Sequence, residues 1–353
     1  MENELMEKER LSCMVGGLLY VPALKEGMAE KITAGRISAL MSVAFCLEDA
    51  VADEAVERAE TVLVQTMAEL AQAEAKLPLI FVRVRNPEHL AHVHRILMPY
   101  GHILTGYVLP KFDLSNGAQY LAQAVKINAE SRKKFYVMPT LETKAVADIA
   151  TRAAELTALK ELMDSYRELI LNVRVGANDF CQLYGLRRTV TQTIYDIGVV
   201  RDILTDILNV FAADYVVSGA VWNCFGVGDG AWSRGLAREL ELDRANGFIG
   251  KTAIHPSQLP LIRRSLQVSA EDYSDAEQIL SDEWQETGVK KSAAGGRMNE
   301  VKCHNRWARR VKLLGDIYGV RSSREDLLWL STASILVYKS LDAIKTASEP
   351  ICW

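Results

Sequence analysis

No apolar run in this sequence approaches the roughly 18 residues needed to cross a membrane. The first residues, MENELMEKERLS, are acidic and lack the basic and then apolar pattern of a secretory signal. The chain also lacks a basic excess, since its formal net charge is −4 and its isoelectric point lies near 6.0. We therefore expect a cytoplasmic protein that has neither a membrane nor a nucleic acid as its partner.

Cysteine is sparse and shows no disulfide or metal-binding pattern. The six cysteines are spread over 353 residues without a CxxC motif or the Cys/His spacing of a zinc site. Hydrophobic residues make up 49% of the chain and charged residues 24%. This composition indicates a well-packed globular protein with reduced thiols and excludes a disordered or fibrous chain.

Short apolar, β-branched runs alternate with longer helical patterns from residue 15 to about residue 268, which is typical of βα units around a parallel sheet. Eight runs predict strands at Leu18–Val21, Ser42–Leu47, Leu79–Val84, Gly106–Leu109, Phe135–Pro139, Leu169–Val175, Asp214–Ser218 and Gly250–Ile254. Eight repeats favour a closed (β/α)₈ TIM barrel, an α/β fold, over an open sheet. Functional side chains of such a barrel lie where the strands end, at its C-terminal face.

The strand pattern stops after residue 268. Helical patterns follow in AEDYSDAEQILSDEWQETG, NEVKCHNRWARRVKLLGDIYG and SREDLLWLSTASILVYKSLDAI, with a Gly-rich break at Lys290–Arg297 between the first two. We therefore predict a catalytic barrel over residues 1–268 and a helical C-terminal extension over residues 269–353.

Two acids follow neighbouring predicted strands, Glu142 after the fifth and Asp179 after the sixth. Carboxylates that share one rim suit Mg²⁺, for which Mn²⁺ could substitute, and a 2-oxo acid could chelate that ion through its keto and carboxylate oxygens. The alternative is that both acids only cap the helices that follow them. Position alone does not separate these two interpretations.

Arg83 and Arg85 lie on one side of the third predicted strand, in LIFVRVRN, and a guanidinium there can hold a substrate carboxylate. We prefer Arg83, which lies deeper in the strand. The alternative is a structural ion pair with Glu48 or Asp49, which follow the second strand. One of these two acids should face the barrel, where it could orient Arg83 or a metal-bound water, and the other should cap a helix.

Weaker signals surround these residues. Gly226, Gly228 and Gly230 follow the seventh strand and could cradle a phosphate, although a simple turn explains them as well. Three cations could contribute to anion binding: Lys111 after the fourth strand, and Arg187 and Arg188 after the sixth. His255 follows the eighth strand and is a candidate general base, but a histidine that hydrogen-bonds the loop backbone fits equally well.

These motifs, in this order, resemble the superfamily of citrate lyase beta subunits and HpcH/HpaI-type aldolases. The resemblance covers nearly the whole chain and rests on LLYVP, CLEDAV, FVRVRN, VLPK, TLETK, GANDF and GKTAIHPSQLPLI. It implies a magnesium-dependent TIM-barrel lyase with Glu142 and Asp179 as metal ligands and Arg83 as the carboxylate clamp. It also implies a homo-oligomer, a trimer or hexamer, in which Glu300 of the GGRMNEVK segment corresponds to an acid that reaches a neighbouring subunit's site.

The chain departs from the superfamily at one predicted entrance to the site, where Ala23, Leu24 and Lys25 follow Pro22 in place of Gly-x-Arg. This departure and the long helical tail resemble the divergent branch associated with tellurite-resistance and stress gene clusters.

The sequence thus predicts a carbon–carbon lyase that acts on a 2-oxo acid or hydroxy acid, or on its coenzyme A thioester, through a metal-stabilised enolate. Two alternatives stay open: a thioester hydrolase that uses the same site, and a non-catalytic metabolite-binding barrel.

Overall fold

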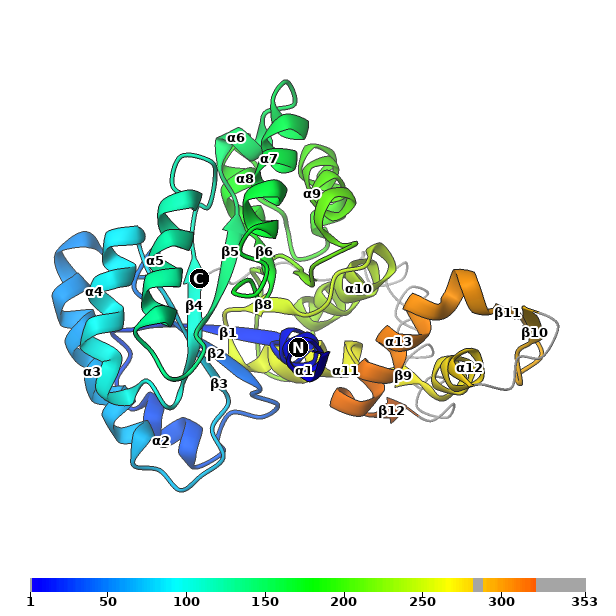
Figure 1. Ribbon diagram of the computed structural model, residues 1–353, viewed down its shortest axis with the longest axis horizontal. Coiled ribbons are helices and arrows are strands. Elements are labelled where there is room, and N and C mark those ends of the chain that lie inside the picture. Colours follow the sequence, from blue (N-terminus) through cyan, green and yellow to red (C-terminus); the bar gives the residue numbers. More distant parts are fainter. Residues whose placement is uncertain (1, 282–287, 322–353) are drawn as a thin grey trace, which may run out of the picture. The chain divides into compact units, whose positions relative to one another are not determined.

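The computed structural model describes residues 2–281 and 288–321, which fall in two compact units, Met1–Leu266 and Gln267–Trp353. The first unit is built around eight parallel strands (Figure 1): β1 (Gly17–Pro22), β2 (Ser42–Cys46), β3 (Leu79–Arg83), β4 (Leu104–Leu109), β5 (Tyr136–Leu141), β6 (Val173–Val175), β7 (Val217–Ser218) and β8 (Lys251–Ala253). The strands pair in the order β7-β6-β5-β4-β3-β2-β1-β8, and a bridge between Gly219 and Lys251 brings β7 against β8. The predicted TIM barrel is therefore confirmed.

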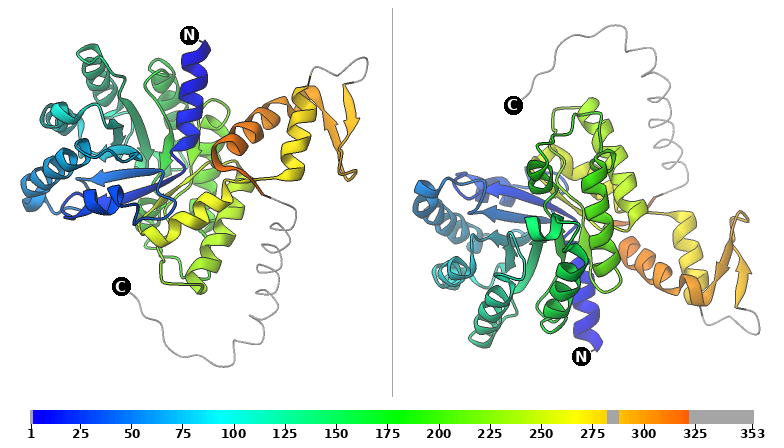
Figure 2. Two further views of the ribbon diagram at one scale, coloured as in Figure 1. Left: turned by 90° about the horizontal axis from the view of Figure 1, so that it is seen from below. Right: turned by 90° about the horizontal axis from the view of Figure 1, so that it is seen from above.

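Helices precede, connect and follow the strands and lie outside them (Figures 1 and 2). They are α1 (Glu2–Met14), α2 (Met28–Thr33), α3 (Val56–Ala71), α4 (Pro87–Leu97), α5 (Gly117–Ala129), α6 (Lys144–Ala147), α7 (Arg152–Asp164), α8 (Ala177–Leu183), α9 (Gly198–Phe211), α10 (Ala231–Asn246) and α11 (Leu259–Ser265). In α9 the buried residues Val200, Ile203, Leu204, Ile207 and Phe211 recur at the spacing of one helical face. Within the described residues, no helix is both long enough and apolar enough to cross a membrane.

The barrel interior changes from apolar to polar along the strands. A buried cluster that includes Leu18, Phe81 and Met138 fills one end. Two residues further along the same strands, and therefore on the same face, stand Tyr20, Arg83 and Thr140. Burying each large apolar side chain contributes about 1.5–3 kcal/mol, so the apolar end holds the barrel together while the polar end is left for a site.

Several predicted strands are shorter in the structure. The sixth was expected over Leu169–Val175, but only β6 (Val173–Val175) forms a ladder, with a single bridge between Val137 and Ile170 ahead of it. The seventh was expected from Asp214, but Asp214 lies in a turn, and its carboxylate pairs with Lys160 and Arg167. Turn and side-chain hydrogen bonds replace the ladder at these strand starts.

The second unit contains β9 (Val268–Ser269), α12 (Ala270–Leu280), β10 (Val289–Lys291), β11 (Met298–Glu300), α13 (Val301–Tyr318) and β12 (Val320–Arg321). Its helices α12 and α13 lie within the first two predicted helical segments, and the Gly-rich break between them was not predicted to contain strands but forms the antiparallel β10–β11 hairpin at one end of the helix pair (Figure 2). Apolar residues of α12 and α13 pack together with Val268. The third predicted helix, in SREDLLWLSTASILVYKSLDAI, lies outside the described residues.

Candidate active site at the barrel rim

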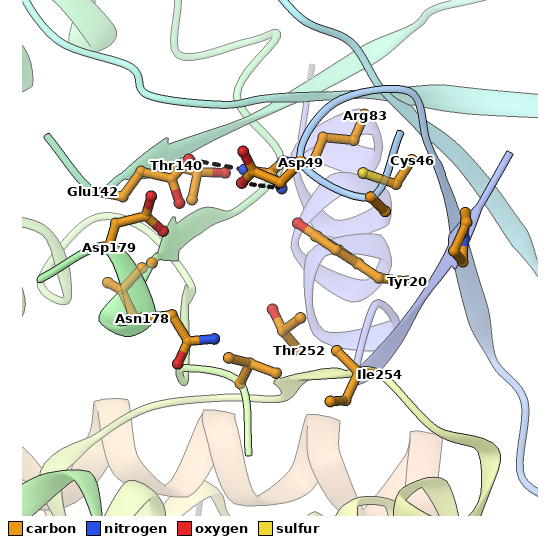
Figure 3. A pocket seen from close by; sticks show the side chains of 15 residues that line it. Tyr20, Cys46, Asp49, Arg83, Thr140, Glu142, Asn178, Asp179, Thr252 and Ile254 are labelled. Carbon is orange, nitrogen blue, oxygen red and sulfur yellow. Dashed lines mark hydrogen bonds and ion pairs between the residues drawn. The ribbon is translucent and has the colours of Figure 1, made fainter. Parts of the chain in front are cut away.

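A cavity of about 370 Å³ opens at the carboxyl ends of the barrel strands. Its lining includes Tyr20 of β1, Arg83 of β3, Thr140 of β5, Glu142 directly after β5, Asp179 in α8 and Thr252 of β8. Figure 3 shows the Glu142 and Asp179 carboxylates on one wall, with Tyr20 and Thr252 across the cavity. The volume suits a small organic acid rather than a macromolecule.

Arg83 is the last residue of β3, and it is buried. Its Nη1 lies 2.9 Å from Glu48 Oε2 and 3.2 Å from Asp49 Oδ2, and its Nη2 donates to Glu142 Oε1 over 3.0 Å. The alternative of a structural ion pair with Glu48 or Asp49 is thus realised with both acids, yet Arg83 also lines the cavity. Arg85 points elsewhere, and its Nη1 donates to the Leu47 carbonyl.

Glu48 and Asp49 share their cations. The Lys111 ammonium contacts Glu48 and lies 2.9 Å from Asp49 Oδ1, while the Lys111 backbone N–H donates to Glu142 Oε1 over 2.9 Å. The expectation that one of the two acids caps a helix was wrong, because Ala52 occupies the N-cap position of the following 3₁₀ turn. Asp49 lines the cavity, whereas Glu48 is buried and is not part of the lining.

The helix-cap interpretation of Glu142 is also wrong. Thr143 holds the N-cap position of α6, and the Glu142 carboxylate turns to Arg83 and Lys111 instead. Asp179 lies in the first turn of α8, for which Gly176 is the N-cap residue. A Cβ atom on Gly176 would come within 2.0 Å of Glu142 Oε2, so only glycine admits the Glu142 carboxylate here.

The pKa values of both wall carboxylates are raised, in each case mainly by burial. Burial raises the pKa of Glu142 to about 7, and the Asp179 charge acts in the same direction against the opposing Arg83 charge. Burial, followed by the charge of Asp49, raises the pKa of Asp179. Crowded carboxylates of this kind are stabilised in their charged form by a bound cation.

Six charged residues therefore form one group, the rim cluster: Glu48, Asp49, Arg83, Lys111, Glu142 and Asp179. Its four carboxylates face two cations, so with all four acids ionised the group has an excess of two negative charges, the charge that one divalent cation cancels. Across the part of the chain that the structure describes, no group of three or more His, Cys, Asp or Glu side chains is arranged to hold a metal. A cation at the rim would thus take few protein ligands, and water or substrate would fill its other positions.

Arg188 was predicted to contribute to anion binding at the rim, but it does not line the cavity. It belongs to a second group, the closed cluster, formed by Arg188, Glu239, Asp243 and Lys251. Its Nη1 lies 2.6 Å from Glu239 Oε2, its Nη2 contacts the Val221 carbonyl, and its guanidinium lies over the Trp222 ring. The Arg188 guanidinium is therefore occupied by its ion pair with Glu239 of α10. Arg187, by contrast, is exposed.

The glycines after β7 serve the start of α10. Gly230 is the N-cap residue of that helix, Gly228 has a φ of 65°, and a Cβ on Gly226 would lie 2.7 Å from the Trp232 ring. The helix start therefore explains these glycines. Their role as a phosphate cradle stays a prediction.

His255 is not brought into the cavity. Its Nδ1 accepts from the Ser257 backbone N–H over 3.2 Å, which caps the following 3₁₀ turn, and its ring stacks on Phe225 at 4.4 Å. Partial burial lowers the pKa of His255. The alternative of a histidine that hydrogen-bonds the loop backbone fits these contacts.

Among the lining residues that the sequence did not predict are three strand residues with polar groups, Tyr20, Thr140 and Thr252. Each is a polar or amphipathic residue inside an apolar run, at the parity of the inward-facing positions. Alternation along each strand, which places every second side chain inside the barrel, is the sequence signal that could have identified them.

A parallel eight-stranded barrel with acids and an arginine at the carboxyl ends of its strands defines an enzyme of the TIM-barrel type. Residues 9–320 match the model of the family described as C–C bond lyase of the TIM-barrel fold. The chain belongs to this family, and so it is a carbon–carbon lyase.

Solved structures support the fold. A citrate lyase from Burkholderia xenovorans LB400 has a TM-score of 0.65 at 17% identity and covers 87% of this chain and 93% of its own. The protein CitE from Mycobacterium tuberculosis, in complex with magnesium, acetoacetate and coenzyme A, has a TM-score of 0.57 at 22% identity, with coverages of 85% and 98%. A comparison with the sequences of curated proteins gave no match.

Proposed function

We propose that this lyase depends on Mg²⁺, which Mn²⁺ can replace, and acts on a 2-oxo acid or hydroxy acid, free or as its coenzyme A thioester. The observation that carries the proposal is the rim cluster, in which Glu142 and Asp179 line one cavity with Arg83 and two negative charges are left over. Glu142 and Asp179 would hold the ion. When bound, it would draw electron density from the substrate carbonyl and so favour cleavage of the adjacent carbon–carbon bond.

The chain's own residues bind and orient the substrate. Arg83 presents its guanidinium between Glu48, Asp49 and Glu142, and its buried Nε has no hydrogen-bond partner among the described residues. Because Arg83 lines the cavity, its guanidinium can hold a substrate carboxylate there. The three carboxylates around Arg83 hold it in place before the substrate arrives, which reduces the entropy lost on binding.

Asp49 is the acid best placed to orient a substrate hydroxyl group or a water molecule, because it lines the cavity and half of its side chain is exposed. Although partial burial opposes this, contacts with Glu48, Lys111 and Arg83 lower the pKa of Asp49. It therefore stays charged at neutral pH and accepts hydrogen bonds. The coenzyme A arm of the proposal draws support from the M. tuberculosis protein, whose complex contains that cofactor.

Metal removal followed by product analysis tests the proposal. After treatment with EDTA, we expect turnover of hydroxy acids or their thioesters to disappear and to return with Mg²⁺. Glu142→Gln should lose both turnover and binding of Mn²⁺. Electron paramagnetic resonance measures the bound Mn²⁺. Asp202→Asn, which changes an exposed acid on α9, is the matched control.

Activity that is indifferent to EDTA and to Glu142→Gln would overturn the proposal. Release of free coenzyme A without carbon–carbon cleavage would instead identify a thioester hydrolase. Binding of acids without any turnover would indicate a metabolite-binding barrel.

A further inference from the structure

Tyr20 extends from β1 into the cavity, opposite the acids of the rim. It lines the pocket together with Glu142 and Asp179, and Figure 3 shows its hydroxyl end turned toward those two carboxylates. A phenol in this position can reach a substrate that is held at the acids. The proposed function assigns no role to this side chain.

Cleavage of a carbon–carbon bond beside a carbonyl group leaves an electron pair on carbon, and that carbon must take up a proton. The charged residues of the cavity lining are poor sources of this proton. Asp49 is ionised at neutral pH, and the Arg83 guanidinium does not lose a proton in proteins. Glu142 and Asp179 would hold the metal ion, which requires their ionised form.

Two neutral side chains of the lining are weak acids, Tyr20 with its phenol and Cys46 with its thiol. The Cys46 side chain is only 1% exposed, whereas Tyr20 is partly exposed. Burial raises the pKa of Tyr20, although the charges of Arg174 and Arg83 act against this. The phenol therefore keeps its proton at neutral pH until a much more basic carbanion forms beside it.

The anion that remains when Tyr20 gives up its proton would lie close to two guanidinium groups. The Cζ atoms of Arg83 and Arg174 lie 5.7 Å and 6.0 Å from the centroid of the Tyr20 ring. Arg174 is in the middle of β6, and its Nη2 donates to Thr252 Oγ1 over 2.6 Å. Its Nε and Nη1 have no hydrogen-bond partner among the described residues. Positive charge so close to the phenol stabilises its anion in a buried site.

Arg174 also lacks a counter-ion, and this separates it from the other buried cations. Within the described ranges, a carboxylate oxygen lies within 3 Å of each of the remaining buried arginines and lysines, which are Arg83, Arg152, Arg188 and Lys251. A buried charge without a partner destabilises a fold. A negative charge that forms on Tyr20 during turnover would supply the partner that Arg174 lacks.

We propose that Tyr20 is the acid that protonates the carbanion formed by carbon–carbon cleavage, and that Arg174 is a positioning residue whose charge stabilises the resulting tyrosinate. The electron pair of the broken bond takes the proton of the Tyr20 O–H. A C–H bond forms, and the negative charge moves to the phenolic oxygen. The proton that the substrate hydroxyl group has released then restores the phenol through water. This inference rests on the proposed function, because it names the proton donor of the same reaction.

Exchange of the methyl protons of pyruvate with D₂O measures the reverse of this step, in which the tyrosinate takes a proton from carbon. Proton NMR follows the exchange with Mg²⁺ present, and we expect the wild type to catalyse it. Tyr20→Phe should slow the exchange by about 100–10,000-fold. Its affinity for pyruvate, measured by calorimetry, should not change, because Arg83 and the metal acids are retained.

The matched control is Tyr100→Phe, which removes the same hydroxyl group from the 3₁₀ turn Met98–Tyr100 ahead of β4, at the end of the barrel opposite the cavity. It should exchange the methyl protons at the rate of the wild type.

Arg174→Met should slow the exchange by about 10–100-fold, which is below the loss for a donor in direct contact with a developing charge. Affinity for pyruvate and Mn²⁺ should not change, and Arg174→Lys should restore part of the rate. Without ligand, Arg174→Met should melt no lower than the wild type, because it removes a charge that has no partner. Arg201→Met makes the same substitution on the surface of α9 and should leave the rate unchanged.

Absence of exchange in the wild type would overturn the role of Tyr20. Exchange that Tyr20→Phe leaves unchanged would overturn it as well and assign the proton to Asp49. A loss of pyruvate affinity as large as the loss of exchange would show that Tyr20 only binds the substrate. A rate unchanged in Arg174→Met would overturn the role of Arg174.

Metal binding separates this proposal from the proposed function. A wild type that binds no Mn²⁺ and exchanges equally well in EDTA defeats the proposed function, whereas exchange that depends on Tyr20 under either condition keeps the proton donor. A wild type that binds Mn²⁺ and catalyses no exchange defeats the proton donor alone.

Discussion

The rim cluster and the closed cluster are both groups of buried charges on the same barrel, yet they are balanced differently. In the closed cluster two cations meet two carboxylates, with Lys251 Nζ 2.8 Å from Glu239 Oε1 and 2.7 Å from Asp243 Oδ2. The rim cluster has four carboxylates and two cations around a cavity. The closed cluster is complete without a ligand, whereas the rim cluster gains from one.

This difference separates the energetic roles of the two clusters. Tyr195 donates to Asp243 Oδ1 and the Ile194 backbone N–H donates to Glu239 Oε2, so each carboxylate of the closed cluster also accepts a hydrogen bond from outside the cluster. Such a group holds α10 to β8. At the rim, repulsion between carboxylates and unpaired donors destabilise the folded protein without ligand. A bound ligand that neutralises these groups would stabilise it.

Lys251→Met should have the largest effect on stability. It leaves Glu239 and Asp243 buried without this ammonium, and removal of one partner from a buried ion pair costs about 3–5 kcal/mol. The free energy of unfolding from urea titration measures this loss. Arg174→Met, at the other fully buried cation of the strands, is the matched comparison and should cost far less, so an equal loss in both variants would break the comparison.

Gly176→Ala should weaken metal binding without changing any charge. The added Cβ would lie 2.0 Å from Glu142 Oε2 and 2.5 Å from its Cβ, so the carboxylate must move. We expect a loss of Mn²⁺ affinity of roughly 10–100-fold, the size seen when the groups that orient metal ligands are removed. Gly198→Ala, where no atom lies closer than 4.0 Å, is the control and should bind Mn²⁺ normally.

The stability of the metal-free protein should depend on pH through Glu142. Its pKa is raised from 4.5 to about 7 in the folded state. The folded protein therefore binds the proton more tightly than the unfolded chain, and this contribution is present below pH 4.5 and is lost as pH rises through about 7.

Thermal denaturation from about pH 5 to pH 8 checks the sign. The melting temperature should fall by roughly 2–5 °C across this window, which corresponds to about 1–2 kcal/mol in a domain of this size. Mg²⁺ should remove most of the fall, because proton and metal compete for Glu142. Glu142→Gln should flatten the profile, and a profile unchanged by this variant would assign the dependence to other groups.

Lys111→Met should have the smallest effect. The ammonium contacts Glu48 and Asp49, but half of its side chain is exposed, and exposed ion pairs contribute less than about 1 kcal/mol. Affinity for Mn²⁺ should not fall, because the variant increases the negative excess of the rim cluster and keeps the backbone N–H that Glu142 uses. A loss of metal affinity would show that the ammonium positions the carboxylates.

The sequence predicted the barrel and much of its rim because both depend on local order along the chain. Alternating apolar runs and helical patterns define βα units, and parallel strands place their carboxyl ends at one face. Glu142, Asp179 and Arg83 could therefore be assigned to one rim. The residue ranges of β6 and β7 were less accurate, since side-chain and turn hydrogen bonds end those ladders.

Other features depended on partners that are distant in the sequence. Arg188 looked like a free rim cation, but Glu239, 51 residues later, pairs with it behind the cavity. Glu48 and Asp49 were expected to point in different directions, one into the barrel and one toward a helix start. Both instead form ion pairs with Arg83. The β10–β11 hairpin around the Gly-rich break was missed because its strands are only three residues each.

By itself, the sequence determined the fold class and the acids at the strand ends, because residue periodicity and position along a strand are local properties. Only the tertiary structure decided which charges are balanced. The same residue type, a buried arginine, is paired with a carboxylate at Arg188 and has none at Arg174. Charge balance in a low-dielectric interior depends on distances of a few ångströms between strands and helices that no single segment encodes.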